Sequence, residues 1–376
     1  MYTNADGICS KLPEFKDRIQ TINPDIICIT ETKLEAIITD EALGLVQYNI
    51  WRKERKNKEG GGIMILIKKE LTATEVELIT TTYAEALAVE VKTKRGSLLV
   101  ATTYIAPKTD TWNTEEHKQL QQESLDTLKH LLQRAETKSQ EIILTGDFNC
   151  AIDWNKFEAI YKPHITKRWN EHVLDLVTEF CLHQHVKENT RARGTDNPSM
   201  LDLIFTRQEG DITDTTYNAP LGMSDHAVIN MKYCIEAESN IGKYKGKYNY
   251  KKGDYTGLKK YLSKFKWESE LNVTDINMQN GKFLKLLKEG MDKHIPQTKE
   301  ERKHRNPKKW FNPKCAKARA NKELLWIRYK RHPSDAALER YKEARNNYAK
   351  ETKENCSEPD RRRKSCNSRK NSRKSI

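Results

Sequence analysis

Acidic, amide and imidazole side chains gather in short clusters that lie far apart in the chain. Four of them border predicted strands, at 3–7 (TNADG), 29–33 (ITETK), 145–150 (TGDFNC) and 222–227 (GMSDHA). A fifth, 200–204 (MLDLI), places Asp202 inside an apolar run. Phosphodiester hydrolysis needs such a set, because a hard divalent cation prefers carboxylate and amide oxygens and the attacking water needs a nearby base. A histidine held by a buried aspartate supplies an oriented imidazole.

Each cluster taken alone has a simpler explanation. A Gly-Asp-x-Asn sequence after a strand is often only a polar turn. The Ser-Asp-His sequence could be a loop with a satisfied histidine, and a lone Glu after a strand is usually solvated. Asp202 is harder to explain in this way, because burial of an unpaired carboxylate is costly. The occurrence of all five clusters in one chain therefore favours a hydrolytic site.

Two further groups of residues have both a functional and a structural interpretation. His183 and His185 could bind a metal from one face of a strand, but we expect them to cap or line that strand. Trp310, Trp326, Tyr329 and Tyr341 lie among Lys and Arg and could stack on nucleic-acid bases. Their helical spacing favours the inner face of a helical hairpin instead.

The first 235 residues predict many short strands with few helices between them. Apolar runs rich in Val, Ile, Leu, Tyr and Thr, each bounded by turn residues, indicate strands; they lie at 25–30, 47–51, 62–67, 86–92, 98–105, 141–145, 201–205 and 227–233. Helical periodicity appears at 12–22, 114–135 and 169–180, and Thr114 is expected to cap its helix without a capping box, because His117 stands three residues later. This order predicts an α+β layered sandwich.

The chain changes character after Glu236. Residues 1–240 hold 28 Lys+Arg against 37 Asp+Glu, a net charge of −9, whereas residues 241–376 hold 39 against 16, a net of +23; these sum to the overall +14. We expect a domain at 1–235, a basic linker at 236–252, a basic helical connector at 253–355 and a disordered basic tail at 356–376. Within the connector, helices are expected at 255–265, 278–294, 315–330 and 335–353. The basic part suits a polyanion, although a solvated helical face would have the same composition.

The eight cysteines show neither Cys-x-x-Cys pairs nor metal-like spacing, so zinc is not expected. The chain has no apolar run near 18 residues and no signal-peptide pattern. We therefore expect an intracellular protein in a reducing compartment without a membrane partner.

The order N-A-D-G, T-E-T-K, T-T-Y-I-A-P, G-D-F-N, L-D-L-I-F and S-D-H resembles the endonuclease/exonuclease/phosphatase superfamily over about residues 1–233. Within it, the chain looks like the apurinic-type endonuclease domain of non-LTR (LINE-type) retrotransposon polyproteins. The segments that carry this resemblance are YTNAD at 2–6, GDFNCAIDW at 146–154 and ENTR at 188–191, and residues 310–345 resemble the basic connector before reverse transcriptase. The resemblance implies a four-layer α/β/β/α sandwich followed by a basic helical extension.

The resemblance also implies a role for each matching residue. Glu31 would be the main ligand of Mg²⁺, or of Mn²⁺ in its place, with Asn4, Asp6 and Asp225 assisting. Tyr104 would donate its hydroxyl to the scissile phosphate, and Asp147 would activate water or handle the leaving-group proton. The remaining roles are phosphate binding by Asn149 and His226, with His226 oriented by Asp202. The product would be a DNA nick with a 3′-hydroxyl.

Two departures from the family pattern bear on these expectations. A full strand normally precedes the first Asn, but only residues 1–3 precede Asn4, so we expect a truncated central strand, unpaired backbone groups and poorly placed Asn4 and Asp6. No polymerase-like segment follows, as in a truncated element copy or an incomplete gene model. We expect DNA as the partner, element RNA at the basic end, a monomer and a nuclear location. The basic loop 51–60 is expected on phosphates.

The resemblance leaves two alternative functions open. One is a phosphatase or phosphodiesterase of the same fold that acts on a non-nucleic substrate, an inositol phosphate or a sphingolipid, and the other is a nucleic-acid-binding relic whose front half no longer catalyses. The sequence at 146–154 and the basic connector argue against the first, whereas the short amino-terminal strand motivates the second.

Overall fold

A computed structural model describes residues 1–56, 58–94, 96–150, 152–154, 168–194, 196–235, 248–272, 276–296 and 312–371, and the side chains among these except 276–278 and 355–371. The chain forms two compact units. The larger comprises Met1–Ser239 and Lys308–Ile376, and the smaller comprises Asn240–Pro307. Most of the predicted linker at 236–252 lies outside the described residues.

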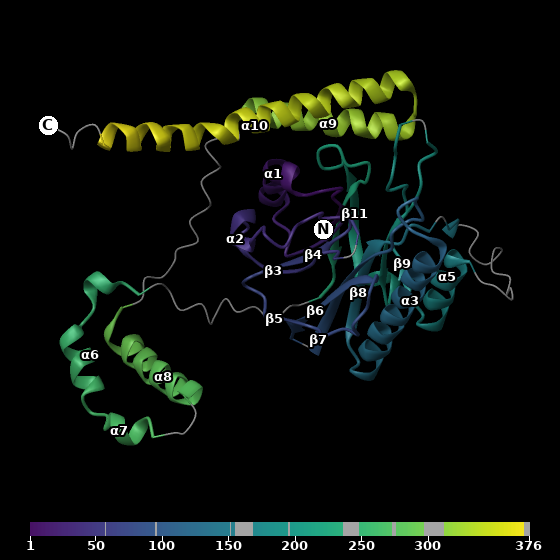
Figure 1. The fold of residues 1–376 in the computed structure, drawn as a ribbon. Coiled ribbons are helices and arrows are strands. Elements are labelled where there is room, and N and C mark those ends of the chain that lie inside the picture. Colours follow the sequence, from purple (N-terminus) through teal and green to yellow (C-terminus); the bar gives the residue numbers. More distant parts are fainter. Residues whose placement is uncertain are drawn as a thin grey trace. The chain divides into compact units, whose positions relative to one another are not determined.

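Two six-stranded sheets form the centre of the larger unit (Figure 1). The strands of the first sheet lie in the order β11 (Ile212–Asn218), β12 (Val228–Tyr233), β1 (Tyr2–Asn4), β2 (Ile26–Thr30), β4 (Ile63–Lys68) and β3 (Tyr48–Lys53). The strands of the second sheet lie in the order β5 (Ala73–Glu75), β6 (Glu85–Thr93), β7 (Gly96–Tyr104), β8 (Glu141–Asp147), β10 (Asp202–Thr206) and β9 (His183–Gln184). Both sheets mix parallel and antiparallel pairs.

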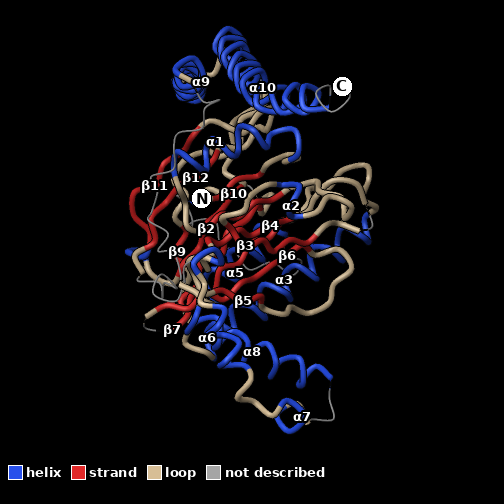
Figure 2. Tube along the Cα trace, turned by 90° about the vertical axis from the view of Figure 1, so that its left-hand side faces the viewer, coloured by secondary structure: helices blue, strands red, loops and turns tan. Residues whose placement is uncertain are grey.

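Three apolar layers hold the sheets and helices together. Residues such as Tyr2, Ile65 and Val100 fill the space between the two sheets. The outer face of the second sheet packs on α3 and α5, and that of the first sheet packs on α1 and α2; these helices are Thr114–Thr137, Trp169–Glu179, Leu12–Ile22 and Asp40–Leu43. Figure 2 shows the strands enclosed between the helical layers. The expected α/β/β/α sandwich is confirmed.

Strand β1 is short but fully integrated, so the expectation of unpaired backbone at this end was wrong. Tyr2, Thr3 and Asn4 are completely buried and pair in parallel with β2, while Tyr2 also faces Ile229 of β12. The amino group of Met1 donates to the Ile26 carbonyl at 2.9 Å. Three residues are enough because the hydrogen bonds of both neighbours converge on them.

The cap of α3 differs from the expectation for Thr114. Asn113 is the cap residue, accepting from the Glu116 N–H at 2.9 Å, while the Glu116 carboxylate accepts from the Asn113 N–H at 3.2 Å. The start of the helix was placed correctly, but the cap lies one residue earlier, where an asparagine and a glutamate complete a capping box.

The basic carboxyl-terminal half does not form one continuous connector. Helices α6, α7 and α8 (Tyr255–Leu262, Trp267–Glu270 and Ile276–His294) belong to the smaller unit. Helices α9 and α10 (Pro313–Arg331 and Asp335–Asn371) form an antiparallel hairpin beside α1 in the larger unit (Figure 1). The hairpin packs on the larger unit through apolar side chains. Trp326, Tyr329 and Tyr341 are buried on its inner face, as expected, whereas Trp310 lies outside the described residues.

The tail expected to be disordered from 356 is helical to Asn371. Helix propagation adds one hydrogen bond per residue to an existing helix, and Lys and Arg favour helices. Pro359 within this stretch lacks an N–H and disfavours a helix interior, so propensity alone does not explain the continuation. Short 3-10 turns occur at Cys9–Lys11, Glu209–Asp211 and Tyr250–Lys252. Among the described residues, no helix has the length and apolarity required to cross a membrane.

Candidate active site

His226 lies at the centre of a buried polar group, at the ends of inner strands of the two sheets. Its Nδ1 donates to the Asp202 Oδ2 at 2.7 Å, and its Nε2 lies 3.8 Å from the Asp147 Oδ2. Asp202 begins β10 and Asp147 ends β8, and the two strands pair with these residues opposite each other. Tyr2 completes the set by donating its hydroxyl to the Asp202 Oδ1 at 2.8 Å. Asp202 thus fixes both the orientation and the tautomer of the imidazole.

Asn4 connects this group to Glu31 across the sandwich. Its Nδ2 donates to the Glu31 Oε1 at 2.8 Å and to the Asp147 Oδ2 at 2.9 Å. Asn4 ends β1 and Glu31 follows β2, which are parallel neighbours, so both side chains leave the same edge of the first sheet. The expectation that Asn4 would be poorly placed was therefore wrong.

Backbone conformation directs several of these side chains. Asp6, Glu31, Lys33 and Asn149 all have positive φ, between 44° and 48°, a region that non-glycine residues seldom adopt. The hydrogen bond from the Gly7 N–H to the Glu31 carbonyl, at 2.8 Å, helps to hold this conformation. Such backbone strain collects at functional sites because the surrounding structure has to maintain it.

Tyr104 and Asn149 flank the central group differently. Tyr104 ends β7 beside Asp147 of β8, and the charge of Glu31 acts on its hydroxyl. Asn149 donates its backbone N–H to the Asp147 Oδ1 at 3.1 Å, but its side-chain amide donates to the Ile105 carbonyl at 2.9 Å. Its amide nitrogen is therefore engaged with the backbone, and its contact with Asp147 comes from the main chain.

Asp225 and Asp6 lie at the rim of the site, each beside a cation. Asp225 Oδ1 is 3.7 Å from the His226 Nε2, and its Oδ2 accepts from the Arg191 Nε at 3.0 Å. The Asp6 side chain is 43% exposed and accepts from the Lys33 Nζ at 2.5 Å. Contacts with one another thus join six of the predicted residues: Asn4, Glu31, Asp147, Asn149, Asp202 and His226. Asp6 is attached at the rim, where its N–H donates to the Asn4 Oδ1 at 3.0 Å, and Asp225 lies beside His226.

The donor set at Glu31 and Asp6 fits a hard divalent cation. Both carboxylates approach one positive charge, the Lys33 ammonium, at 3.5 Å from Glu31 Oε2 and 2.5 Å from Asp6 Oδ1. Carboxylate oxygens around a partly exposed position are the ligands that Mg²⁺ and Mn²⁺ prefer. Ligand atoms of Asp147, Asp202 and His226 also lie within 4.8 Å of one another. In that trio, however, the His226 Nδ1 already donates to Asp202, which favours a proton relay there.

Burial and the surrounding carboxylates alter the proton affinities of the central group. Burial raises the pKa of Asp147, and the nearby His226 offsets part of that rise. Burial lowers the pKa of His226, but Asp202, Asp147 and Asp225 outweigh it and raise the pKa to well above its ordinary value. Burial and the charges of Glu31 and Asp147 raise the pKa of Tyr104. The surrounding carboxylates thus favour the protonated form of the His226 imidazole.

Three side chains in or beside the site were missed by the sequence reasoning. Tyr2 supports Asp202, as described above. Glu85 is buried and accepts from the Arg55 Nε at 2.7 Å, and the Arg55 guanidinium lies 5.4 Å from the centre of the Tyr104 ring. Glu85 pairs with Tyr104 across β6 and β7. A charged residue at an inward position of a strand is costly to bury without a partner, and this was the signal by which Glu85 could have been found.

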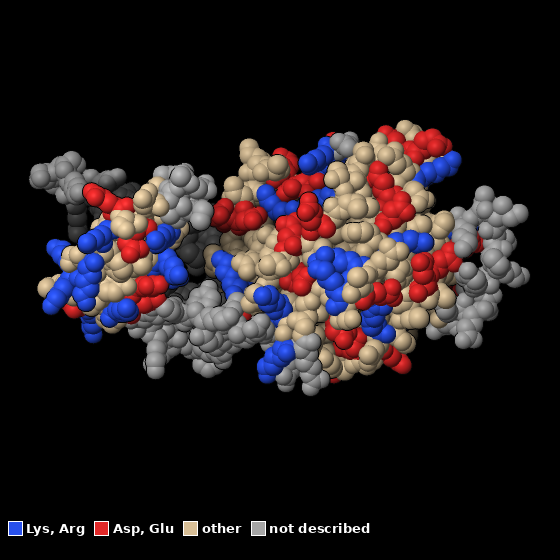
Figure 3. All heavy atoms as spheres, turned by 90° about the horizontal axis from the view of Figure 1, so that it is seen from below, with Lys and Arg blue, Asp and Glu red and all other residues tan. Residues whose placement is uncertain are grey.

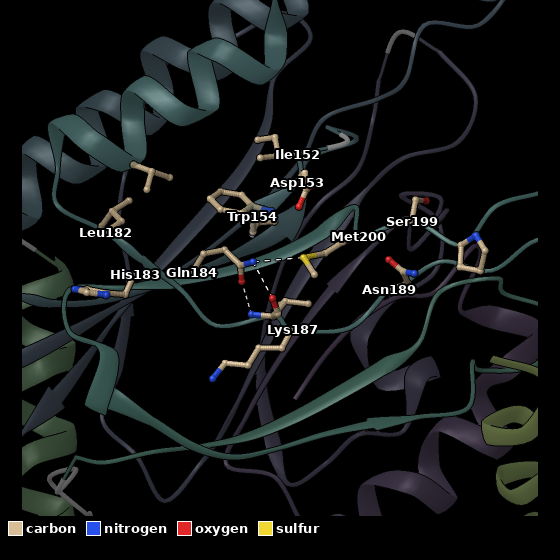
Figure 4. Close-up of a pocket in the computed structure, with 13 residues that line it drawn as sticks. Ile152, Asp153, Trp154, Leu182, His183, Gln184, Lys187, Asn189, Ser199 and Met200 are labelled. Atoms are coloured by element: carbon tan, nitrogen blue, oxygen red, sulfur yellow. Dashed lines mark hydrogen bonds between the residues drawn. The ribbon is translucent and has the colours of Figure 1, made fainter. Parts of the chain in front are cut away.

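A separate hollow of about 820 Å³ lies along β9 and the loop before β10 (Figure 4). Its lining includes Trp154, His183 and Met200, and the Gln184 amide donates to the Met200 sulfur at 3.4 Å. None of the nine predicted site residues lines it. His183 is exposed on β9, and the His185 ring is hydrogen-bonded to the Thr206 hydroxyl at 2.7 Å, as the strand-lining interpretation expects.

Residues 3–226 match the model of the Endonuclease/Exonuclease/phosphatase family, which covers well over half of the chain. Two curated proteins of Drosophila melanogaster are similar to part of it. The probable RNA-directed DNA polymerase from transposon X-element is 28% identical over 148 residues, which is 39% of this chain and 14% of that protein. The corresponding protein of transposon BS is 26% identical over 106 residues, or 28% and 12%. The chain thus spans only a small part of these relatives.

Two solved structures are similar to this chain. The catalytic domain of Xenopus laevis APE2 aligns with a TM-score of 0.50 and 14% identity, over 63% of this chain and 92% of that one. The endonuclease domain of TRAS1, a telomere-specific non-LTR retrotransposon, aligns with a TM-score of 0.45 and 14% identity, over 62% and 98%. The first of these similarities supports the sandwich described above.

Proposed function

The chain belongs to the Endonuclease/Exonuclease/phosphatase family, and from this premise we propose that it cuts DNA by hydrolysing a phosphodiester bond, leaving a nick with a 3′-hydroxyl. The observation that carries the proposal is the continuous polar connection from Asp202 through His226, Asp147 and Asn4 to Glu31. It combines an oriented imidazole, a buried carboxylate and a cation-binding carboxylate in one site, which together can bind a phosphate and activate water.

Each residue has a task that its environment supports. The His226 imidazolium would neutralise charge on the phosphorane oxygens, with Asp202 holding it in orientation. Asp147 would accept the proton of the attacking water, since burial raises its pKa and makes it a stronger base. Tyr104 would donate its hydroxyl to the phosphate, and Asn149 would steady Asp147 through its N–H.

A bound divalent cation would supply Lewis-acid polarisation of the phosphate and would lower the pKa of a bound water. We propose Mg²⁺ as this cation, with Mn²⁺ able to replace it, held by Glu31 and Asp6 with Asn4 beside them and Asp225 assisting. Lys33 would leave its position between Glu31 and Asp6 when the cation binds.

DNA is the substrate that the site's surroundings favour. The basic loop 51–60 carries Arg55 and Lys58 next to Trp112, and these cations suit phosphates beside Tyr104. We propose that the basic carboxyl-terminal half adds contacts to nucleic acid, including the RNA of a mobile element, and that the protein acts as a monomer in the nucleus. The alternative of a non-catalytic relic rested mainly on the short first strand, and that strand is buried and paired with β2.

The test is conversion of supercoiled plasmid to open circle by the full chain with Mg²⁺. We expect the wild type to nick and EDTA to abolish nicking. Glu31→Gln should lower the rate by about 100-fold or more, because it removes the carboxylate charge that would hold the cation against the reacting phosphate. Extension of the nick by a DNA polymerase without phosphatase treatment would identify the 3′-hydroxyl.

The matched control is Glu35→Gln, which removes the same charge from an exposed position four residues away. Glu35→Gln should nick like the wild type. The proposal fails if folded wild type leaves the plasmid intact. Preferential hydrolysis of an inositol phosphate would indicate the alternative with a non-nucleic substrate. Salt-dependent retardation of DNA by both the wild type and Glu31→Gln, without cleavage by either, would indicate a binding protein.

A further inference from the structure

The loop that precedes His226 has its backbone held by helix α9. Residues 219–227 connect β11 to β12. The Ala219 N–H donates to the Glu323 Oε2 at 2.7 Å, and the Lys322 Nζ donates to the Pro220 carbonyl at 2.5 Å. Lys322 is completely buried, although lysine is almost never fully buried without a partner. Two adjacent residues, about 100 positions later in the chain, thus satisfy two adjacent backbone groups of the loop.

Helix α1 completes this clamp from the other side. The Arg18 Nη2 donates to the Ala219 carbonyl at 3.1 Å and to the Glu323 Oε1 at 2.7 Å. The Glu14 Oε2 accepts from the Gly222 N–H at 3.0 Å, and its Oε1 accepts from the Lys322 ammonium. The buried charges of α1 and α9 are therefore paired through the loop as well as with each other, so the loop belongs to one hydrogen-bond network with both helices.

An apolar contact reinforces the clamp at the catalytic end of the loop. The rings of Trp326, Tyr329 and Tyr341 pack on Ala192, Ala219 and Ala227 in one buried cluster. Ala227 follows His226 directly, and Ala192 follows Arg191, whose guanidinium binds Asp225. The Tyr329 hydroxyl also donates to the Gly194 carbonyl at 2.6 Å. The hairpin thus contacts both chain segments that border His226.

From these contacts we infer that Lys322 and Glu323 are positioning residues for the catalytic loop, so that the α9–α10 hairpin is a working part of the nuclease. The kinetic part of this inference rests on the proposed function. His226 reaches Asp202 from this loop, where an antiparallel bridge pairs its backbone with Arg191, in the segment that the hairpin also contacts at Ala192 and Gly194. A displacement of about 1 Å at such a site lowers the rate about 100-fold. Direct substrate contact is not required for this effect.

The experiment compares Glu323→Gln with the wild type in the full chain, by amide hydrogen exchange and by plasmid nicking with Mg²⁺. Gln keeps the size of Glu323 but cannot accept from both Ala219 N–H and Arg18 with two oxygens. We expect exchange at the 219–227 amides to accelerate about 10-fold, kcat to fall about 10-fold or more and KM to change little, because substrate binding remains while His226 is misplaced.

Two variants of α10 separate positioning from general stability. Glu343→Gln removes the same charge from an exposed site. Tyr348→Phe deletes the buried hydrogen bond to the Asp17 Oδ2 at 2.6 Å, which attaches the hairpin to α1 without touching the loop. Both should leave kcat and loop exchange unchanged well below their melting temperatures, although Tyr348→Phe should melt earlier.

Unchanged loop exchange in Glu323→Gln would overturn the inference, and so would an equal loss of kcat in Tyr348→Phe. If the wild type does not nick at all, the proposed function fails, while the exchange measurement still decides whether Glu323 holds the loop. Lys322→Met, compared with the exposed Lys317→Met, provides a second pair with the same expected difference in exchange.

Discussion

At the scale of single residues, the two fully buried carboxylates beside His226 act on its imidazole in different ways, while Asp225 lies at the rim. Asp202 shares a direct hydrogen bond with the His226 Nδ1 at 2.7 Å, whereas Asp147 lies 3.8 Å from Nε2, beyond hydrogen-bond distance. Asp202 also accepts from Tyr2 and is completely buried. The first carboxylate is therefore an orienting group, and the second remains available for a proton from the substrate side.

This asymmetry predicts the effect of Asp202→Asn. Nicking by this variant should slow by about 10- to 100-fold, the usual cost of losing a carboxylate that orients a functional histidine. The pKa of His226 should fall, because Asp202 raises it and burial lowers it. NMR titration of the His226 ring measures the shift, and Asp214→Asn, at an exposed pair with Lys232, is the control. An unchanged imidazole pKa would contradict this account.

A second residue-scale prediction concerns the cation. Mn²⁺ binding, followed by electron paramagnetic resonance, should weaken about 10-fold or more in Glu31→Gln, because a charged carboxylate binds a hard cation more strongly than the neutral oxygen of an amide. Asp202→Asn should retain nearly the wild-type affinity. The reverse pattern would show that Asp147, Asp202 and His226 hold the metal instead.

At the scale of elements, the sequence was sufficient wherever an apolar pattern was long. All eight predicted strands form with bounds within two residues, and the helix at Leu12–Ile22 has the predicted bounds. Three short or polar strands were missed, namely β5, β9 and β11, and β1 was expected only as a truncated strand. Strands of two or three residues carry no periodic signal, and β11 (ITDTTYN) is a largely exposed edge strand without an apolar face.

The polar clusters at the ends of strands also identified the candidate site, because their residue types are rare as a set. The clamp residues could not be found in this way. Lys322 and Glu323 lie in a helix rich in exposed charges, and only the packing of the hairpin on α1 makes one of them buried. A charged residue in a helical pattern indicates a solvated face until its tertiary partner is known.

One element-scale prediction concerns the close pairing of β7 and β8 at Gly146. A Cβ there would lie 2.4 Å from the Thr103 carbonyl oxygen, which belongs to backbone that cannot yield easily. Gly146→Ala should therefore destabilise the protein by about 1–3 kcal/mol, as overpacking of a core does. It should also displace Asp147. Gly210→Ala is the matched control, since a Cβ there meets nothing within 4 Å. Equal thermal melting of the two variants would contradict the explanation.

At the scale of the whole molecule, charge is divided between the parts of the chain. The smaller unit, residues 240–307, contains 17 Lys+Arg against 8 Asp+Glu, a net of +9. Lys and Arg side chains cover much of the face of this unit that is visible at the left of Figure 3. Exposed Tyr250, Tyr255 and Phe283 accompany them. Cations interspersed with exposed aromatic rings are typical of surfaces that bind single-stranded nucleic acid.

This division predicts a measurable salt effect. Replacement of Lys259, Lys260 and Lys264, all exposed, by Gln should weaken DNA binding and reduce the slope of log K against log salt by about one for each phosphate that is no longer neutralised. Retardation of a labelled oligonucleotide at several salt concentrations measures the slope. Nicking at saturating DNA should not change. A slope equal to that of the wild type would show that these lysines are only solvated.

The clamp has a consequence for the order in which the protein matures on the ribosome. The last strand ends at Tyr233, but Lys322 and Glu323 emerge roughly 90 residues later, which takes about 5 to 18 s at the usual 5–20 residues per second. During that interval the sandwich can assemble while the loop before His226 lacks its buried partners. If the hairpin positions this loop as inferred, the candidate site would reach its full order only after the hairpin has been synthesised.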